Sequence, residues 1–242
     1  GSLLHTYPED SYRYAYKLLL RPITSSDAIA FIKLVRYSSK VSQNSQIHIG
    51  VYWNGNLEGA LQVSPSLDKR KIQTLVRDTP WNGFLELNRM AFTERLPTNS
   101  ESRAIAIAIR LLRKHAPHVQ WIVSFADGTQ CGDGTIYRAT GFILTAINES
   151  RNLVRLPNGT VIHKMTLESN PTRPRPELNG KSYYAITNGK YDLNAYANAT
   201  GGTITTGYQF RYIYPIHPTA RERLTVPEIP YHAIPPHARM YR

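Results

Sequence analysis

The chain has 242 residues, 41% of them hydrophobic, and is long enough to bury a substantial core. Its single cysteine excludes an internal disulfide framework and a cysteine-rich zinc site, and no apolar run approaches the ~18 residues that a membrane-spanning helix needs. Lys and Arg (29) outnumber Asp and Glu (17), and the resulting net charge of +12 attracts polyanions. We therefore expect a soluble, intracellular protein with nucleic acid as its favoured partner, although charge alone also fits a solvated basic surface.

The first third of the chain predicts a strand, a helix and a hairpin. Tyr12–Leu20 is aromatic and aliphatic, as expected of a strand. Ser25 or Ser26 then caps a helix in which apolar residues recur at helical spacing. The strand-like runs Gln46–Trp53 and Leu57–Val63 are separated by Asn-Gly-Asn, the strongest hairpin signal in the chain, so we expect them to pair antiparallel.

The central third predicts a strand, a crossover helix, a second strand and a short helix. Apolar residues alternate along Phe84–Phe92, which is the period of a strand, and recur at helical spacing along Arg103–His115. Trp121–Ala126 is short and mostly apolar, as in a central parallel strand, and Thr135–Ala139 forms a helix that ends at Gly141. This order predicts an α/β (α+β) fold around a mixed central sheet.

The last third predicts more strands and little helix. Asn152–Leu156 and Val161–Leu167 form a hairpin around Pro-Asn-Gly, and Tyr208–Pro215 is a strand that returns to the core. Residues 179–202 are rich in Gly, Asn, Tyr and Ala, show no helical periodicity and look like an insertion. The final segment is punctuated by prolines, so we expect it to be extended and to wrap around the core.

We expect one elaborated domain, with a core over residues 1–150 and a β-rich extension packed on it over residues 151–242. The core holds 17 basic and 12 acidic side chains, a net charge of +5, and the extension holds 12 and 5, a net charge of +7. The shorter extension is therefore the more basic part. Arg173 and Arg175 lie in a segment that its prolines extend, and both are candidates to lie along a DNA backbone.

Lys69, Arg70 and Lys71 form a basic triplet in the polar segment 64–82. Such triplets are common in solvated loops. The competing interpretation is a phosphate contact that positions a polynucleotide without reading its bases. Both interpretations stay open.

The central third resembles the GNAT acyltransferase superfamily. The order strand, helix, strand, short helix carries the resemblance, together with Tyr137 and the pair Gly141-Phe142, which are similar to the superfamily's YxxxGF ending. In that ending the tyrosine often protonates the leaving thiolate. The resemblance therefore implies a general-acid role for Tyr137.

A closer resemblance is to the Mom family of phage proteins. PTNSESR before the central helix, then WIVSFAD, CGDGTIYRATGF and YQFRYIYPIHPTARERLTVPEIP are similar to the family in the right order and span most of the chain. The family places a carbamoylmethyl group on N6 of adenine in phage DNA and so hides sites from restriction enzymes. The resemblance implies a transferase that acts on double-stranded DNA in the cytoplasm of a bacterial host, with no membrane contact.

The turn before the central helix differs from that of ordinary GNAT enzymes, which wrap the pyrophosphate of coenzyme A with glycine-rich backbone amides. Here the turn contains no glycine, Glu101 adds a negative charge, and Thr98 to Glu101 fits a capping box that satisfies the same amides internally. Asn99, Ser100 and Arg103 are the candidates for donor binding. We infer glycyl-tRNA as the donor rather than acetyl-CoA, because the group that the family adds has the composition of a glycine residue.

Four polar residues are candidates for catalysis. Adenine N6 is a poor nucleophile, so a base must take its proton, and Asp127 at the carboxyl end of a strand is our first choice. Ser124 would orient the donor or stabilise an oxyanion, and Tyr137 would act as general acid or orienting donor. Tyr37, after the first helix, is the fourth. Each also has a structural interpretation: a turn at Asp127, a core residue bonded to backbone at Ser124, and packing at the tyrosines.

Iron is the metal that the family resemblance suggests. The eight histidines are scattered without ligand spacing, so the sequence shows no metal site of its own. Relatives carry a histidine just before the tyrosine matched by Tyr37, and Arg36 occupies that position here, which puts a shared iron ligand in doubt. Cys131 lies in a glycine-rich loop with no histidine near it in sequence, so we expect no nucleophilic role.

Two other classes of function stay open. An ordinary GNAT N-acetyltransferase would use acetyl-CoA, and a non-catalytic DNA-binding protein would tolerate loss of Asp127 and Tyr137. In a DNA-modifying enzyme, tyrosines in or near the insertion are candidates to stack on an extruded adenine. They are Tyr183, Tyr184, Tyr191 and Tyr196. No pattern in the sequence indicates the oligomeric state.

Overall fold

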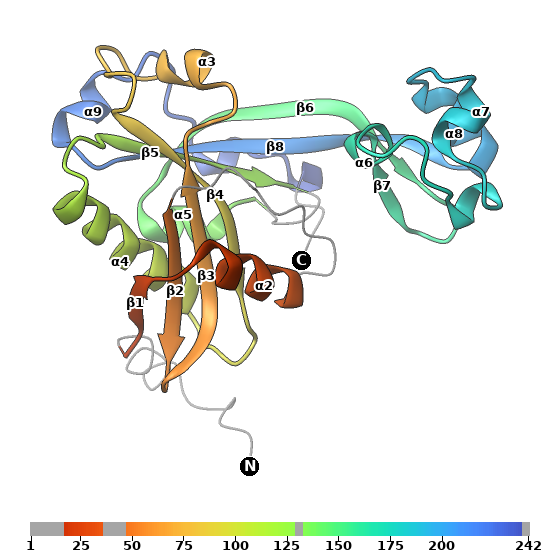
Figure 1. The fold of residues 1–242 in the computed structure, drawn as a ribbon. Coiled ribbons are helices and arrows are strands. Elements are labelled where there is room, and N and C mark those ends of the chain that lie inside the picture. The colour runs from red at the N-terminus through yellow and green to blue at the C-terminus, as the bar shows by residue number, and fades with distance from the viewer. Residues whose placement is uncertain (1–16, 36–46, 129–132, 239–242) are drawn as a thin grey trace. The chain divides into compact units, whose positions relative to one another are not determined.

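The computed structural model of the protein describes residues 17–35, 47–128 and 133–238 (Figure 1). The chain divides into two compact units. The first unit comprises Gly1–Ala126, Gly134–Ala146 and Phe210–Ile234, and the second comprises Asp127–Asp133, Ile147–Gln209 and Pro235–Arg242. The expected single domain with a core over residues 1–150 stays a prediction. Within the described ranges, no helix is long and apolar enough to cross a membrane.

The strands form a mixed sheet in the order β1-β2-β3-β4-β5-β8-β6-β7. Their bounds are β1 (Leu19–Pro22), β2 (Ile47–Trp53), β3 (Asn56–Ser64), β4 (Phe84–Phe92), β5 (Trp121–Asp127), β6 (Ile143–Arg155), β7 (Val161–His163) and β8 (Thr203–Pro215). Neighbours from β1 to β4 are antiparallel, whereas β4 and β5 are parallel and are connected by helix α4 (Ser100–His115). The predicted α/β (α+β) class, with a mixed sheet and a crossover helix, is confirmed.

The hairpin of β2 and β3 turns where the sequence predicts. Asn54 and Gly55 adopt positive φ angles of 52° and 78°, and an Asn-Gly pair enters this left-handed region at low cost. The two strands pair antiparallel, as predicted.

Helix ends follow local chemistry, but not always the residue that we predicted. Helix α2 (Ser25–Val35) is capped by Thr24, whose Oγ1 accepts a hydrogen bond from the backbone N of Asp27 at 3.1 Å, so the predicted caps Ser25 and Ser26 are wrong. Helix α5 (Thr135–Thr140) ends at Gly141 with a φ of 100°, as predicted.

Helices and an apolar cluster cover the sheet of the first unit. Ile32 of α2 packs on Ala60 of β3 and Ala91 of β4, and we call this side of the sheet the α2 face. Leu61 follows Ala60 and therefore points to the opposite face, where it is also fully buried. Both faces of the sheet are thus packed at β3.

The segment between β3 and β4 contains a helix rather than only a loop. Helix α3 (Lys69–Gln73) holds the basic triplet on a single turn, which is too short for a periodic pattern to show in sequence. The inner side of the segment is apolar, because Ile72 of α3 and the following Leu75 and Val76 pack in one buried cluster with Phe84.

The C-terminal segment runs along the first unit, as expected of a proline-punctuated chain. Helix α9 (Pro218–Glu222) follows β8. Backbone hydrogen bonds then join Thr225 N to Leu75 O at 2.9 Å and Ile229 N to Leu144 O at 2.8 Å. The short 3-10 helices η3 (Tyr231–Ala233) and η4 (Pro236–Ala238) end the described chain.

The second unit combines a hairpin with short helices. The pairing of β6 with β7 is antiparallel, as predicted, but β7 ends at His163, whose Nδ1 accepts from Met165 N at 3.1 Å and caps a helix. The helices are α6 (Lys164–Glu168), η2 (Pro176–Leu178), α7 (Tyr183–Thr187) and α8 (Leu193–Thr200). The side chains of Ser182 and Asp192 cap α7 and α8, so residues 179–202 form two helices although their sequence shows no helical periodicity. Helices this short do not show a period.

Candidate active site

Two polar residues of β4 lie between apolar contacts on the α2 face. Phe84 packs in the cluster of α3, and Ala91 packs under α2. Glu86 follows Phe84 by two residues and therefore shares its face. Asn88 lies between Glu86 and Ala91, and both polar side chains are half-buried. Apolar contacts at Phe84 and at Ala91 thus lie on either side of Glu86 and Asn88 along the strand.

The neighbouring strand β3 adds polar side chains at the same level. Ser64 lies opposite Glu86 in the antiparallel register, and Gln62 precedes it on the same face. Ser66 follows just after the strand, and Gln62, Ser64 and Ser66 are all buried. We call the group the polar cluster. Its members are Gln62, Ser64, Ser66, Glu86 and Asn88.

Hydrogen bonds connect the members of the polar cluster across the two strands. Ser66 Oγ donates to Glu86 Oε2 at 2.9 Å, and Asn88 Nδ2 donates to Ser64 Oγ at 2.7 Å. Gln62 is fully buried, with its Nε2 at 3.2 Å from His48 Nδ1. Its Oε1 has no hydrogen-bond partner in the part of the chain that the structure describes. A buried acceptor left unpaired costs about 1–3 kcal/mol, so the polar cluster is not arranged for stability alone.

Burial raises the pKa of the Glu86 carboxyl above its usual value. The hydrogen bond from Ser66 and the charge of Arg89 oppose this shift without cancelling it. A carboxyl whose pKa moves toward neutrality is a more effective general base or acid than an ordinary one. Glu86 therefore has the properties of a proton-transfer group.

The backbone is irregular where the polar cluster lies. Gln62 pairs with Arg89 but Val63 pairs with Leu87, so β4 carries an extra residue, Asn88, as a β-bulge. Parallel pairing of β4 with β5 extends only to Glu86, which pairs with Val123. Bulges are enriched next to active sites, because they redirect a side chain and end a ladder. The two strands part beside Glu86 and Asn88.

Comparison with known proteins places the chain in a family. The model of the Mom protein family matches residues 17–233. The chain belongs to the Mom protein family. It is also 31% identical over 204 residues to the methylcarbamoylase Mom of Escherichia phage Mu, a match that covers 81% of this chain and 75% of the phage Mu protein. The resemblance to this family that the sequence motifs indicated is confirmed.

GNAT acetyltransferases are among the solved structures that are similar to this Mom-family protein. One is a GNAT family acetyltransferase from Elizabethkingia anophelis with acetyl-CoA bound, 13% identical, with a TM-score of 0.42 over 81% of this chain and 97% of that chain. Another is the spermidine/spermine N-acetyltransferase of Vibrio cholerae, 12% identical, with a TM-score of 0.45 over 84% and 95% of the two chains. The likeness is distant, and the fold class rests on the sheet order given above.

The predicted catalytic residues have different surroundings in this Mom-family protein. Ser124 is fully buried and its Oγ donates to Leu87 O at 2.8 Å, across the point where β4 and β5 part, which favours its structural interpretation. Tyr137 is also buried and packs between Phe142 and Tyr212, with ring centroids 5.2 and 5.3 Å away. Both residues belong to the first unit.

The other two predicted catalytic residues differ from this pair. Asp127 ends β5, is half-buried and belongs to the second unit. Tyr37 lies outside the described residues. Sequence reasoning missed Glu86, although an acidic residue inside an apolar strand was a signal that could have been used.

The predicted capping box before α4 is not formed. Asn99 is the N-cap with a φ of 67°, and its side chain makes no capping hydrogen bond. Ser100 is buried and its backbone N bonds to Pro97 O at 3.1 Å, while its Oγ has no partner in the described structure. Arg103 is half-buried on the first turn. The argument that Thr98 blocks the helix amides is therefore wrong, whereas the missing glycine and the charge of Glu101 still distinguish this turn.

The predicted DNA contacts divide into exposed and buried residues. Arg70, Lys71 and Arg173 are exposed, and Lys69 is half-buried. Arg175 is buried, pairs with Glu177 through Nη1 and Oε1 at 3.0 Å, and donates to Thr166 O at 3.2 Å. This geometry favours a structural role for Arg175 over contact with a DNA backbone.

Two of the four tyrosines singled out in the sequence form the core of the second unit. Tyr183 and Tyr196 are fully buried, which disfavours stacking on an adenine. Tyr196 Oη donates to Glu177 Oε1 at 2.8 Å, and burial together with this bond raises the pKa of Tyr196. Tyr191 is 58% exposed and its ring lies 6.5 Å from that of Tyr183 and 5.7 Å from that of Tyr184.

The described residues do not fit an iron site. In the ranges 17–35, 47–128 and 133–238, no three His, Cys, Asp or Glu side chains are placed to hold a metal ion. Arg36, Tyr37 and Cys131 lie outside these ranges.

Proposed function

We propose that this Mom-family protein is a DNA-modifying transferase that installs a carbamoylmethyl group on N6 of adenine, which would protect the DNA from restriction. Family membership over residues 17–233 is the observation that carries the proposal. The similarity to a methylcarbamoylase supports the type of group transferred. The net charge of +12 supports double-stranded DNA as the substrate, since cations bind phosphates by releasing counterions. The reaction would take place in the cytoplasm of a bacterial host.

Glu86 is the base in the proposed reaction. The adenine amino group must lose a proton as N6 attacks, and a base within hydrogen-bond reach makes this step feasible. Glu86 has a raised pKa and is half-buried on the α2 face.

Asp127 and Tyr137 keep proposed roles that are tested separately. Asp127 is the alternative base, because it ends β5 at the carboxyl edge where sheet proteins place function. Tyr137 is the proposed acid or orienting donor of the family's YxxxGF ending. Ser124 has no chemical role in this proposal, because its hydroxyl is bonded to backbone.

We propose glycyl-tRNA as the acyl donor. A bond forms between N6 and the glycyl carbonyl carbon as the ester bond to the tRNA ribose breaks, and the proton that the base takes from N6 ends on the leaving ribose oxygen. The N6-glycyl product and the carbamoylmethyl product are isomers, so rearrangement completes the reaction without a further reactant. Asn99, Ser100 and Arg103, on the first turn of α4, are the proposed donor contacts.

Nucleoside mass spectrometry of plasmid DNA from cells that express the protein tests the modification. We expect carbamoylmethyladenine in DNA from cells that express the wild type. Unmodified adenine in cells that contain the expressed protein would overturn the proposal. Purified protein incubated with DNA and labelled glycyl-tRNA tests the donor. Label in DNA supports the tRNA donor, whereas transfer from labelled acetyl-CoA alone would indicate an ordinary acetyltransferase.

A further inference from the structure

Buried hydrogen bonds through Thr79 hold the segment between β3 and β4 on the first unit. Trp121 Nε1 donates to Thr79 Oγ1 at 3.0 Å, and Thr79 Oγ1 donates to Val76 O at 2.7 Å. Gln73 Nε2 also donates to Thr79 O at 2.8 Å. With the buried residues of α3, these bonds hold the segment on the apolar cluster of the first unit. Its outer side is therefore a defined surface.

The outer side exposes two large apolar side chains. Leu67 is 95% exposed, and Trp81 is 50% exposed on a tight turn in which Gly83 N bonds to Pro80 O at 2.8 Å. Indoles are usually well buried, because burying their area stabilises the fold. Two exposed apolar side chains on one anchored segment indicate a contact surface.

The same segment is basic. Lys69, Arg70, Lys71 and Arg77 outnumber the two acids of residues 67–82, which are Asp68 and Asp78. Lys69 Nζ lies 4.6 Å from the centroid of the Trp81 ring and donates to Asn82 Oδ1 at 2.8 Å. Its charge lies against the indole through a cation–π contact. Aromatic rings among cations are the combination that single-stranded nucleic acid binds.

We propose that Leu67, Trp81 and the cations of α3 bind the DNA strand next to the unstacked adenine, with Trp81 stacked on the base that neighbours this adenine and the cations on the phosphates. This surface, which we call the α3 surface, rests on the proposed action on adenine. Enzymes that react at a base must take it out of the stack, and neighbouring bases then expose their faces.

The α3 surface adjoins Glu86, the proposed proton acceptor. Ser66 bonds to Glu86, and Leu67 is the next residue in the chain. A strand that brings an adenine to Glu86 would therefore pass Leu67 first. This continuity favours the DNA strand over tRNA as the occupant, because the acceptor adenine belongs to the DNA.

Binding measurements with purified protein and no donor test the α3 surface. The probes are a DNA duplex with one unpaired adenine, a fully paired duplex and tRNA. Trp81→Ala is expected to bind the unpaired-adenine duplex about tenfold more weakly, since one stacked base is worth about that factor. Trp81→Phe keeps an aromatic ring and should retain most of the affinity. Quenching of tryptophan fluorescence by the unpaired-adenine duplex should shrink in this variant.

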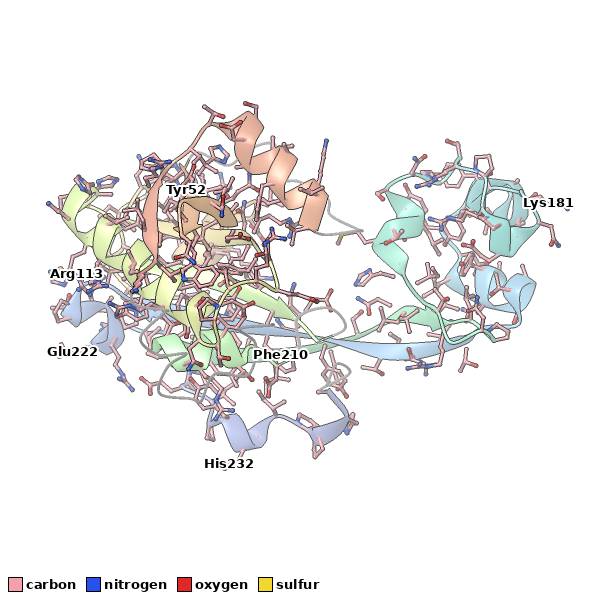
Figure 2. The ribbon with its side chains drawn as sticks, turned by 90° about the horizontal axis from the view of Figure 1, so that it is seen from below. Tyr52, Arg113, Lys181, Phe210, Glu222 and His232 are labelled. Carbon is pink, nitrogen blue, oxygen red and sulfur yellow. The ribbon has the colours of Figure 1, made fainter. Side chains whose placement is uncertain are left out.

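Matched controls change exposed residues elsewhere in the first unit. Leu34→Ala removes an 83% exposed apolar side chain of α2, and Arg113→Gln removes a cation of α4, labelled in Figure 2. Both are expected to bind like the wild type. Unchanged affinity of Trp81→Ala for the unpaired-adenine duplex would overturn the proposal, as would an equal loss on the fully paired duplex or a loss confined to tRNA.

The binding assay separates this inference from the proposed function. Trp81-dependent binding by a wild-type protein that modifies no adenine would support the α3 surface and contradict the transferase. If cells that express Trp81→Ala contain as much modified adenine as cells that express the wild type, the result would support the transferase and contradict the α3 surface. Thermal unfolding of each variant confirms that the fold is retained.

Discussion

Two half-buried glutamates, one in each unit, show opposite behaviour. In the second unit, burial raises the pKa of Glu177, but hydrogen bonds from its own backbone, Tyr196 and Arg175 outweigh burial and lower it. In the first unit, burial raises the pKa of Glu86, and the bond from Ser66 does not compensate. The two side chains have the same chemistry and differ in the number of donors around them.

The difference in pKa separates a carboxylate that stabilises the fold from one that is suited to catalysis. Glu177 is held ionised by a closed network that also fixes Arg175 and Tyr196, so its charge stabilises the second unit. Burial makes it easy for Glu86 to gain a proton, so its charged form lowers the stability of the fold at neutral pH but suits proton transfer. Burial alone therefore does not identify a functional carboxylate, whereas burial with few donors does.

Replacing Glu86 by Gln should give the largest effect. We expect the modified fraction of adenine to fall by about 10²–10⁴-fold, the range for loss of a general base. The amide keeps the size and the bond from Ser66, so the fold should be retained. Mass spectrometry of plasmid DNA measures the effect, with Asp127→Asn alongside. If only Asp127→Asn abolishes modification, Asp127 is the base and the role of Glu86 is rejected.

Tyr196→Phe should break the closed network of the second unit. Loss of a hydrogen bond to a charged group destabilises a protein by about 1.5–3 kcal/mol. Chemical denaturation of the purified protein measures this change, and Tyr191→Phe is the control because Tyr191 is exposed. Equal stability of both variants would show that the bond to Glu177 contributes nothing.

Ser124→Ala should have a smaller effect, of about 1 kcal/mol on unfolding, because it removes the neutral hydrogen bond to Leu87 O. Modification of plasmid DNA should be retained. A variant that is as stable as the wild type but modifies no DNA would restore the catalytic role that the sequence suggested for Ser124.

The pH dependence of stability gives the smallest expected effect and compares the two glutamates directly. Glu86 has a raised pKa in the fold, so its favourable contribution is complete below the ordinary value of 4.5 and is lost as pH rises through the raised value. Glu177 has a lowered pKa, so its contribution is present above 4.5 and is lost as pH falls. Glu86→Gln should therefore gain stability relative to the wild type on going from acid to neutral pH, and Glu177→Gln should lose it. Denaturation of both variants across this range checks the signs.

The elements that the sequence predicted well are those with strong local signals. Strand β4 has the predicted bounds because its apolar residues alternate over nine positions. The Asn54-Gly55 turn depends on the backbone preference of two residues, and Gly141 acts in the same way at the end of α5. Helices α3 and α7 were missed because five residues are too few for a helical period.

The site was harder to predict because it depends on contacts between distant segments. Glu86 has a raised pKa because the fold buries it, and the sequence shows only that an acid lies inside an apolar strand, not how far packing covers it. One error could have been avoided from the sequence alone. Ser124 and Asp127 are three positions apart on one strand, so they point to opposite faces and do not both meet one adenine across β5.

The bond between Thr145 and Arg211 marks where the chain leaves the first unit and where it returns. Arg211 Nε donates to Thr145 Oγ1 at 3.0 Å, and β6 and β8, which carry these residues, are neighbours in the sheet. A short turn between residues 146 and 210 would therefore close the first unit without shifting any register in it. The intervening 63-residue stretch (147–209) is the part of the second unit that such a turn would replace. Strand β4, which carries Glu86, lies outside this stretch and would keep its place.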